Sequence, residues 1–398
     1  MIPYAKRTQV MAGSAAVVAG LFKAIADPET ISFGIGSPAR ETLPREQIRE
    51  IASELLADPV TGPRMLAYSS PQGEKELREA VAEVLLRPKG VEADPDNIMI
   101  VNGGIETMNL LCQLFIEPGD VILVESPTFV HCVEIFEMFQ ARCIAVDTDD
   151  EGIRPDAVEE AIKRYHPKFV YVVPTFHNPS GRTLTLERRK RLAELGSEYD
   201  VVILEDDPYR DLRFSGEELK PIKAFDKTGN TILANSFSKI FSPGARLGYV
   251  LATQEIIDRL FDIKVATNSQ TNTTLQLICA EYFKRGYFAE HLEKTRALYR
   301  ERCKVMMECI DKYFPAGTRR TTPEGGLFIW AELPEGYDTT ALLKKAGPYK
   351  VSFVPGEGFF VEGGGKGKNC MRLSYGAIPE DKIRVGMERL GRLIAEES

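Results

Sequence analysis

The sequence contains no apolar run that approaches the roughly 18–20 residues a helix needs to cross a membrane. It also contains no block of basic residues, since 50 Lys and Arg stand against 58 Asp and Glu and leave a net charge of −8. Proteins that bind nucleic-acid phosphates usually carry basic patches, so we expect neither a nucleic-acid nor a membrane partner. The short run of small residues near the N-terminus is interrupted by Gly20, which argues against a secretory signal.

Residues that commonly bind metals are few and scattered. The sequence has four histidines, no H-E-x-x-H motif and no cluster of Cys with His, so we expect no metal site. None of the seven cysteines forms a C-x-x-C pair, and they occur in apolar strand-like or helix-like contexts. We therefore interpret them as reduced core thiols, which are typical of a cytoplasmic protein.

Between about residues 95 and 250, apolar strand-like runs alternate with helical patterns. Continuously apolar strands separated by helices indicate a buried, mainly parallel sheet with helices on both faces. The pattern predicts an α/β fold with a sheet of the seven-stranded type. The expected strands are 97–101, 121–125, 142–146, 169–174, 201–205, 231–235 and 247–252, and the helices between them include 106–115, 129–139, 155–164 and 186–199.

The C-terminal part follows a different pattern, which predicts a smaller α+β domain. The first 40 residues are too few to fold alone, so we expect them to pack on this domain. We therefore predict a large domain over 41–289 and a small domain formed by 1–40 and 290–398. The expected C-terminal elements are helices over 287–315 and 379–396 and strands over 325–333, 349–353 and 370–374.

Polar residues follow four of the predicted strands, at the point where each strand ends. In an open α/β sheet, ligands bind beyond the carboxyl ends of the strands, so these residues are candidates for one site. They are a glycine turn, an amide, an acid with a phenol, and a hydroxyl–lysine–arginine set. In sequence they are Asn102-Gly103-Gly104-Ile105, Asn178-Pro179, Asp206 with Tyr209, and Ser236, Lys239 and Arg246.

Together these groups meet the needs of one cofactor, pyridoxal 5'-phosphate. Backbone N–H groups at a helix start can hold its phosphate, and Arg and Ser can add hydrogen bonds to it. A carboxylate can keep the ring nitrogen protonated, and a lysine amine can bond to the aldehyde. Each feature alone has an ordinary explanation, such as a tight turn, a helix cap or a surface lysine, so the combination carries the inference.

The run from Ser236 to Tyr249 (SFSKIFSPGARLGY) resembles the lysine motif of fold-type-I pyridoxal-phosphate aminotransferases. The resemblance extends from about residue 30 to the end of the chain. It is nearest to the α-aminoadipate/kynurenine aminotransferase-like branch, through FGIGSP (33–38), DTDDEGI (147–153) and VPGEGFF (354–360). Further stretches occur in the same order as in that family, namely 68–73, 177–181, 206–209, 323–330 and 370–375.

The resemblance implies a role for each residue around the cofactor ring. Lys239 would bond to the cofactor and move the proton between the substrate Cα and the cofactor. Asp206 would pair with the ring nitrogen, and Tyr209 and Asn178 would hydrogen-bond the ring 3-oxygen. Phe129 would stack on the ring face.

The resemblance also implies how the phosphate and the substrate are held. Arg372 would bind the substrate carboxylate in a bidentate fork, with Asn178 and the Gly36 amide beside it. Tyr68 would reach the phosphate of the neighbouring subunit, which implies a homodimer with shared active sites. The phosphate of the same subunit would be held by Ser236, Arg246 and the amides of Gly104 and Ile105.

The sequence departs from the family pattern at three places. Related enzymes often carry Ser or Thr where this chain has Gly103-Gly104-Ile105, and Tyr or Trp where it has Phe129. Branch members often have a substrate-binding Arg near the N-terminus, where this chain has the apolar run 17–20. That run could pack on the small domain or cover an aliphatic or aromatic substrate side chain.

We therefore expect an aminotransferase that moves an amino group from an aromatic, aliphatic or aminoadipate-like L-amino acid to a 2-oxo acid such as 2-oxoglutarate. A pyridoxal-phosphate β-lyase or decarboxylase on the same fold is an alternative, because the first proton abstraction is shared. A non-enzymatic regulatory module of the aminotransferase-like type is a second alternative. It fits less well, because only about 30 residues precede the stretch that resembles the family and the net charge is acidic.

Overall fold

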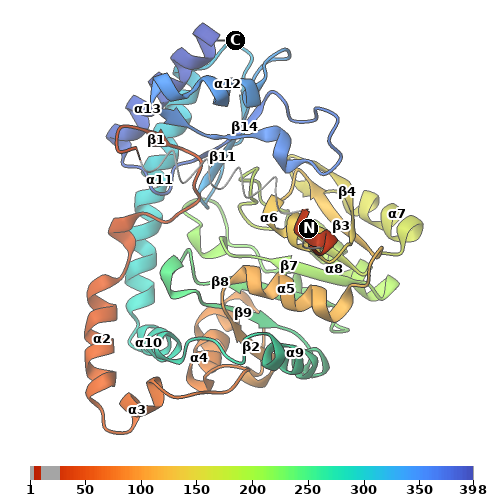
Figure 1. Ribbon diagram of the computed structural model, residues 1–398, viewed down its shortest axis with the longest axis vertical. Coiled ribbons are helices and arrows are strands. Elements are labelled where there is room, and N and C mark those ends of the chain that lie inside the picture. The colour runs from red at the N-terminus through yellow and green to blue at the C-terminus, as the bar shows by residue number, and fades with distance from the viewer. Residues whose placement is uncertain (1–3, 10–26, 398) are drawn as a thin grey trace.

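The computed structural model describes residues 4–9 and 27–397 (Figure 1). The apolar run 17–20 lies outside the described residues. Within the described residues, ten short helical segments accompany the longer elements. They are Lys6–Gln9, Arg40–Thr42, Val81–Leu86, Arg87–Lys89, Pro95–Asn97, Arg210–Leu212, Ile222–Phe225, Pro243–Ala245, Gly347–Tyr349 and Gly356–Phe359.

The largest sheet has eight strands in the order β2-β9-β8-β7-β6-β3-β4-β5. Neighbouring strands are parallel, except that β9 is antiparallel to β2 and β8, and β5 is antiparallel to β4. The mainly parallel α/β sheet predicted from the sequence is thus confirmed, with the two-residue β5 added at one edge. In sheet order the strands are Ile98–Val101, Gly248–Leu251, Thr231–Ser236, Val202–Asp206, Phe169–Val172, Val121–Ser126, Arg142–Asp149 and Gly152–Ile153.

Helices cover both faces of this sheet. In β3, β6 and β7 alternate residues enter two separate cores, one on each face. Val121 and Leu123 of β3 pack with Val158 of α7 on one face. Ile122 of the same strand belongs with Phe136 of α6 to the core on the other face. The helices of this part are α2 (Arg45–Ala57), α3 (Thr61–Met65), α4 (Lys75–Ala80), α5 (Gly104–Phe115), α6 (Val130–Met138), α7 (Pro155–Tyr165), α8 (Leu186–Tyr199), α9 (Gln254–Thr267) and α10 (Thr273–Lys284).

A second, antiparallel sheet in the order β10-β11-β14-β13 lies at the other end of the molecule, beside a two-stranded parallel sheet of β1 and β12 (Figure 1). Strand β11 begins three residues later than predicted, because Gly325 and Gly326 form a turn packed closely against Phe176. The strands are β1 (Ile31–Ser32), β10 (Arg319–Arg320), β11 (Phe328–Glu332), β12 (Val351–Ser352), β13 (Val354–Pro355) and β14 (Cys370–Ser374).

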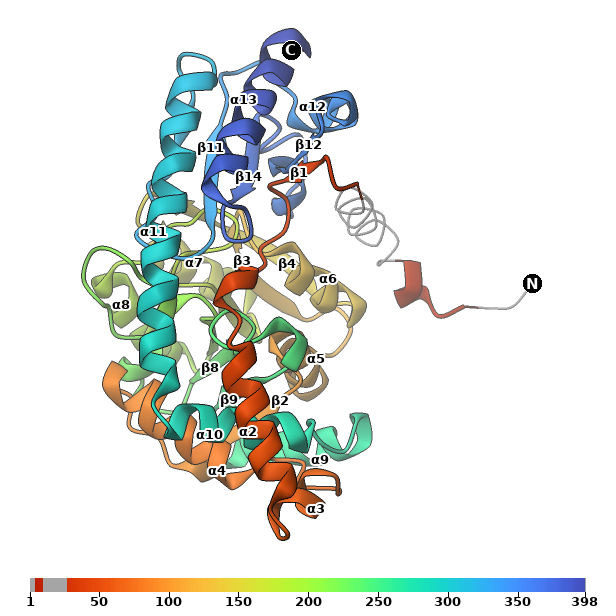
Figure 2. The ribbon, with the colours of Figure 1, turned by 90° about the vertical axis from the view of Figure 1, so that its left-hand side faces the viewer.

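The long helix α11 (Tyr287–Tyr313) runs from the region of the large sheet to that of the small sheets (Figure 2). It packs there against α13 (Glu380–Glu397), while α12 (Thr339–Lys345) lies on the opposite side of α13. The predicted boundary at residue 289 falls inside α11, so the division into 41–289 and 1–40 with 290–398 stays a prediction.

All seven cysteines are unpaired, and six of them are buried, as expected for core thiols. Within residues 4–9 and 27–397, no helix combines the length and the apolar character that crossing a bilayer requires.

Candidate active site

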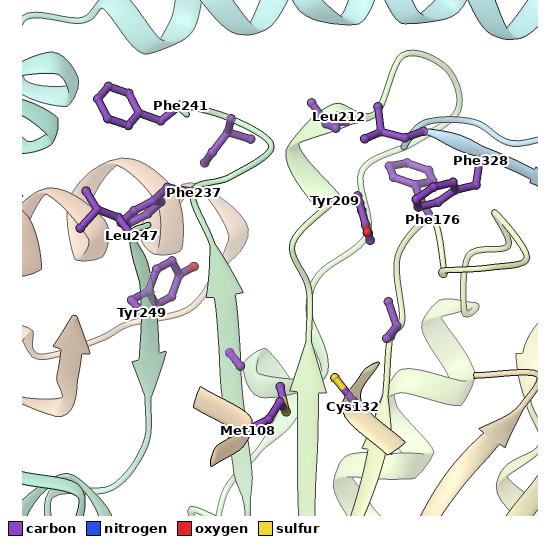
Figure 3. Close-up of a cluster of buried hydrophobic side chains, with 14 of the residues drawn as sticks. Met108, Cys132, Phe176, Tyr209, Leu212, Phe237, Phe241, Leu247, Tyr249 and Phe328 are labelled. Carbon is purple, nitrogen blue, oxygen red and sulfur yellow. The ribbon is translucent and has the colours of Figure 1, made fainter. Parts of the chain in front are cut away.

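Several of the predicted site residues meet where the carboxyl ends of β6, β7 and β8 face the small sheet. Tyr209, just beyond β7, packs edge-on against Phe328 of β11, with 5.7 Å between the ring centroids (Figure 3). Phe176, which follows β6, lies next to Phe328 in the same view. The fold therefore brings residues from distant parts of the chain to one place.

Lys239 lies in the turn after β8 and is half-buried. Its Nζ donates a hydrogen bond to the carbonyl oxygen of Gly36 at 2.6 Å and lies 5.9 Å from the centroid of the Tyr209 ring. Burial lowers the pKa of Lys239 to about 8, and the positive charges of Arg372 and Arg246 act in the same direction. A pKa this low leaves part of the amine unprotonated near neutral pH, which is what a nucleophilic lysine requires.

Asp206 is the last residue of β7 and is buried. Its Oδ2 accepts a hydrogen bond from the hydroxyl of Tyr171 at 2.8 Å. Burial raises the pKa of Asp206 to about 7, against the lowering effect of the Tyr171 hydrogen bond. Among the described residues, only Tyr171 donates a hydrogen bond to this carboxylate, so a cationic group in front of it would be stabilised.

Arg372 of β14 is buried and directed at Asn178. One terminal nitrogen donates to Asn178 Oδ1 at 2.8 Å and the other to the Gly34 carbonyl oxygen at 2.5 Å. The guanidinium lies 4.5 Å from the ring centroid of Phe328 and 5.3 Å from that of Phe359. Burial lowers the pKa of Arg372 to about 10, and its Nε has no hydrogen-bond partner in the described chain. A buried guanidinium that has no carboxylate partner among the residues the structure describes favours binding of a carboxylate.

The glycine turn before α5 lies beside Arg246 and Ser236. Gly103 has a φ of +80°, and a Cβ there would be 2.6 Å from a terminal nitrogen of Arg246. Arg246 donates to the carbonyl oxygen of Asn102 at 3.2 Å, and the Ser236 side chain approaches Gly104. An arginine, a hydroxyl and a helix N-terminus thus converge, which suits a phosphate.

The remaining predicted residues occupy different environments. Phe129 is half-buried at the start of α6, where its ring meets His131 edge-on. Ile105 is exposed, and Tyr68 is 95% exposed. Gly36 accepts the Lys239 hydrogen bond, and a Cβ at this position would be 2.4 Å from the Phe328 ring.

Residues 28–390 match the family described as aminotransferase class I and II. The chain belongs to this family. It is 40% identical to aromatic-amino-acid aminotransferase 1 of Thermococcus litoralis, over 95% of this chain and 91% of that protein. It is 35% identical to the 2-aminoadipate transaminase of Thermus thermophilus, over 96% of this chain and 94% of that protein.

Among solved structures, this aminotransferase is similar to the kynurenine aminotransferase of Pyrococcus horikoshii in complex with PMP. The TM-score is 0.93 with 36% sequence identity, over 99% of this chain and 97% of that one. Fold and family together make this chain a pyridoxal-phosphate-dependent enzyme that transfers amino groups. The resemblance inferred from the sequence motifs is therefore confirmed at the level of the family.

The residues of this aminotransferase fit the cofactor that its family uses. Asp206 is a buried carboxylate that a cationic ring nitrogen would suit, and Lys239 is an amine with a lowered pKa. Gly103 keeps the space beside Arg246 free of a side chain. These features fit a phosphate, a pyridinium and an aldehyde.

The sequence did not identify three side chains that contact the predicted site residues. Tyr171 lies in the middle of an apolar strand, where no pattern marked it. Phe328 and Phe359 lie in segments that resemble the family, but their own side chains are apolar and gave no sign of a role. The small size of the neighbouring Gly325-Gly326 and Gly356 was the one local sign of close packing there.

Proposed function

We propose that this aminotransferase takes the amino group of an aromatic, aliphatic or aminoadipate-like L-amino acid and delivers it to a 2-oxo acid such as 2-oxoglutarate. The main support is the buried Arg372, which offers a fork for an α-carboxylate next to the half-buried amine of Lys239. Donor and acceptor both carry an α-carboxylate, so one fork serves both half-reactions. The substrates named for the relatives are consistent with this range.

Pyridoxal phosphate would be held by the residues around the glycine turn and the strand ends. When bound, it supplies an aldehyde for the substrate amine and a cationic ring that stabilises negative charge at the substrate Cα. Ser236, Arg246 and the amides of Gly104 and Ile105 would bind its phosphate. Phe129 would stack on its ring, and Tyr209 and Asn178 would hydrogen-bond its 3-oxygen.

The proton transfers would fall to two side chains. The Lys239 Nζ, partly unprotonated near neutral pH, would remove the proton from the substrate Cα and later return a proton. The Asp206 carboxylate would hold the proton on the ring nitrogen throughout. Arg372, with Asn178 and the Gly36 amide, would orient the substrate so that its Cα proton faces Lys239.

We also propose that the enzyme acts as a homodimer with shared active sites. Tyr68 is 95% exposed, and Leu66 and Val60 nearby are each 77% exposed. Such an apolar surface suits contact with a second copy, in which Tyr68 would reach the partner's cofactor phosphate. Sedimentation of the purified protein tests this, and a monomer that is fully active would contradict it.

The unpaired cysteines support a reducing environment, so we propose that the protein works in the cytoplasm. Fractionation of the source cells, with the protein detected by an antibody, tests this proposal.

A half-reaction screen tests the substrate proposal. The enzyme loaded with pyridoxal phosphate is mixed with each amino acid in turn, and the loss of its visible absorbance is followed. We expect the fastest conversion with aromatic, aliphatic or aminoadipate-like donors, and regeneration by 2-oxoglutarate. Pyruvate and ammonia formed without any acceptor would instead indicate β-elimination, and carbon dioxide would indicate decarboxylation.

The variant Lys239→Ala tests the central residue. It should fold, bind the cofactor without the spectrum of a covalently held one, and lose turnover by several orders of magnitude. Turnover at the wild-type rate would show that Lys239 does not have the proposed role.

A further inference from the structure

An acidic residue occupies the first turn of α5, where the cofactor phosphate is proposed to bind. Glu106 directly follows Ile105 in this turn. A carboxylate near a helix N-terminus competes with a phosphate for the same partial positive charge and also repels it. A phosphate can therefore bind well here only if another group compensates the negative charge of Glu106.

Lys264 of α9 is that group. Its Nζ lies 3.0 and 2.9 Å from the two carboxylate oxygens of Glu106, and it also donates to Asn268 Oδ1 at 3.2 Å. The Lys264 side chain is 0% exposed and that of Glu106 is 9% exposed. Burial lowers the pKa of Lys264, whereas the charge of Glu106 raises it. Glu106 thus stabilises the charge of Lys264, whose side chain is shielded from water.

The same carboxylate is connected to the glycine turn. Glu106 accepts a hydrogen bond from the backbone N–H of Asn102, and the Asn102 carbonyl oxygen accepts one from Arg246. The backbone before Gly103 is therefore held from both sides, by an acid that pairs with Lys264 and by the arginine of the proposed phosphate site. A change in the Glu106 orientation would move the amides that face the phosphate.

We propose that Lys264 is a positioning residue for the cofactor phosphate. By pairing with Glu106 it neutralises the carboxylate that would otherwise repel the phosphate, and it keeps that carboxylate on the Asn102 N–H. This inference rests on the proposed phosphate site. An ion pair that merely joins α5 to α9 would affect all ligands of the site alike.

The test compares two ligands that differ only in the phosphate. Dissociation constants of pyridoxal phosphate and pyridoxal are measured by absorbance titration on the cofactor-free wild type, K264M, E106Q and the double variant, with thermal melting as a folding check. We expect K264M to bind pyridoxal phosphate about tenfold more weakly or worse, but pyridoxal less than about threefold more weakly. The double variant should recover most of the loss, because the repelling charge is gone.

A matched control is Lys223→Met. Lys223 pairs with Asp226 at 2.8 Å in a largely buried ion pair, at the end of the sheet away from the site. This variant should lower the melting temperature without changing the ratio of the two dissociation constants.

Two results would overturn the proposal: an equal loss of both ligands in K264M, or a double variant as weak as K264M. If K264M does not fold, the E106Q variant provides the test. The proposal would be overturned if E106Q lost tenfold more affinity for pyridoxal phosphate than for pyridoxal. A wild type that binds neither ligand would instead refute the proposed function.

Discussion

Burial shifts the pKa values of Asp206 and Lys239 toward neutral pH, from opposite directions. The pKa of the carboxyl is raised to about 7 and the pKa of the amine is lowered to about 8. Each charged form is disfavoured because it has lost water. A cofactor that offers a positive ring nitrogen to the carboxylate and an aldehyde to the free amine relieves both penalties.

The hydrogen bond from Tyr171 to Asp206 should set the pH at which the cofactor binds well. In Tyr171→Phe the carboxylate loses this bond, so the pKa of Asp206 should rise further above about 7. A hydrogen bond to a charged group contributes about 1.5–3 kcal/mol, so pyridoxal-phosphate affinity at pH 7 should fall about tenfold and recover as the pH rises. Titrations of the cofactor between pH 6 and 9 measure this.

Tyr282→Phe is the control for that variant. Its hydroxyl is also largely buried but contacts His291 and not Asp206, so the pH dependence of binding should not change. A Tyr171→Phe protein with an unshifted pH dependence would show that the hydrogen bond does not tune Asp206.

Arg372→Lys should separate charge from geometry. Lysine keeps the positive charge but lacks the fork that bonds Asn178 and Gly34 at once. It also lacks the planar guanidinium that lies against the rings of Phe328 and Phe359. Losing one charge-assisted bond of this kind corresponds to about a hundredfold rise in KM for the amino acid, with cofactor affinity nearly unchanged. Half-reaction rates against amino acid concentration measure it, and an unchanged KM would exclude Arg372 as the carboxylate site.

At the scale of elements, the connection between β2 and α5 decides whether a phosphate can be held. Strand β2 ends at Val101 and α5 begins at Gly104, so only two residues reverse the chain. Gly103 makes this possible with a φ of +80°, which side chains other than glycine rarely adopt. The tight turn presents the first amides of α5 next to Arg246.

Gly103→Ala should therefore damage cofactor binding as well as stability. The new Cβ would lie 2.6 Å from the Arg246 guanidinium and displace it, and we expect at least about a tenfold loss of pyridoxal-phosphate affinity. Gly119→Ala is a matched control, because it has a φ of +95° but no atom within 4 Å of the added Cβ. It should cost about 1–2 kcal/mol of stability and leave cofactor affinity intact. Equal affinities in both variants would contradict the argument.

At the scale of the whole molecule, the small sheet is attached to the large one close to the site. The Ser126 hydroxyl at the end of β3 donates a hydrogen bond to the Glu362 carboxylate. The Lys366 Nζ lies 3.5 Å from the Asp147 Oδ1. The Thr128 N–H donates a hydrogen bond to the Phe359 carbonyl oxygen. These contacts fix the part that carries Arg372 relative to the part that carries Lys239. The site therefore depends on the packing of both parts.

The buried Asp206 should make the stability of the cofactor-free protein depend on pH. Its pKa is about 7 when folded and near 3.8 when unfolded, so the folded state binds the extra proton between these values. Stability from this group is therefore present below about pH 4 and is lost as the pH rises to about 7. Compared with the Asp206→Asn variant, the wild type should lose a few kcal/mol of unfolding free energy as the pH rises over this range. Urea unfolding at several pH values measures it. Parallel curves for the two proteins would show that Asp206 is not buried as described.

Local patterns were enough to specify the seven longer strands of the large sheet and the helices α5 to α8, α11 and α13, but they did not specify helices such as α2, α9 and α10. Continuous apolar runs marked the strands buried on both faces, and α8 and β14 lie at the predicted residues. Glycine, lysine and arginine after the strand ends pointed to a cofactor, because parallel strands deliver their ends to one edge of a sheet. Boundaries failed where packing decided them, as in β11, whose start was delayed by the turn against Phe176.

Only the tertiary structure decided which side chains complete the site and which of them carry a charge. Lys239 meets Gly36 and Arg372 meets Gly34, and these pairs are 203 and 338 positions apart in the chain. Tyr171 and Lys264 gained their roles because the fold buried them beside Asp206 and Glu106. The reason is physical: hydrogen bonding and lost water act through space, whereas periodicity in a sequence reports only on neighbours along the chain.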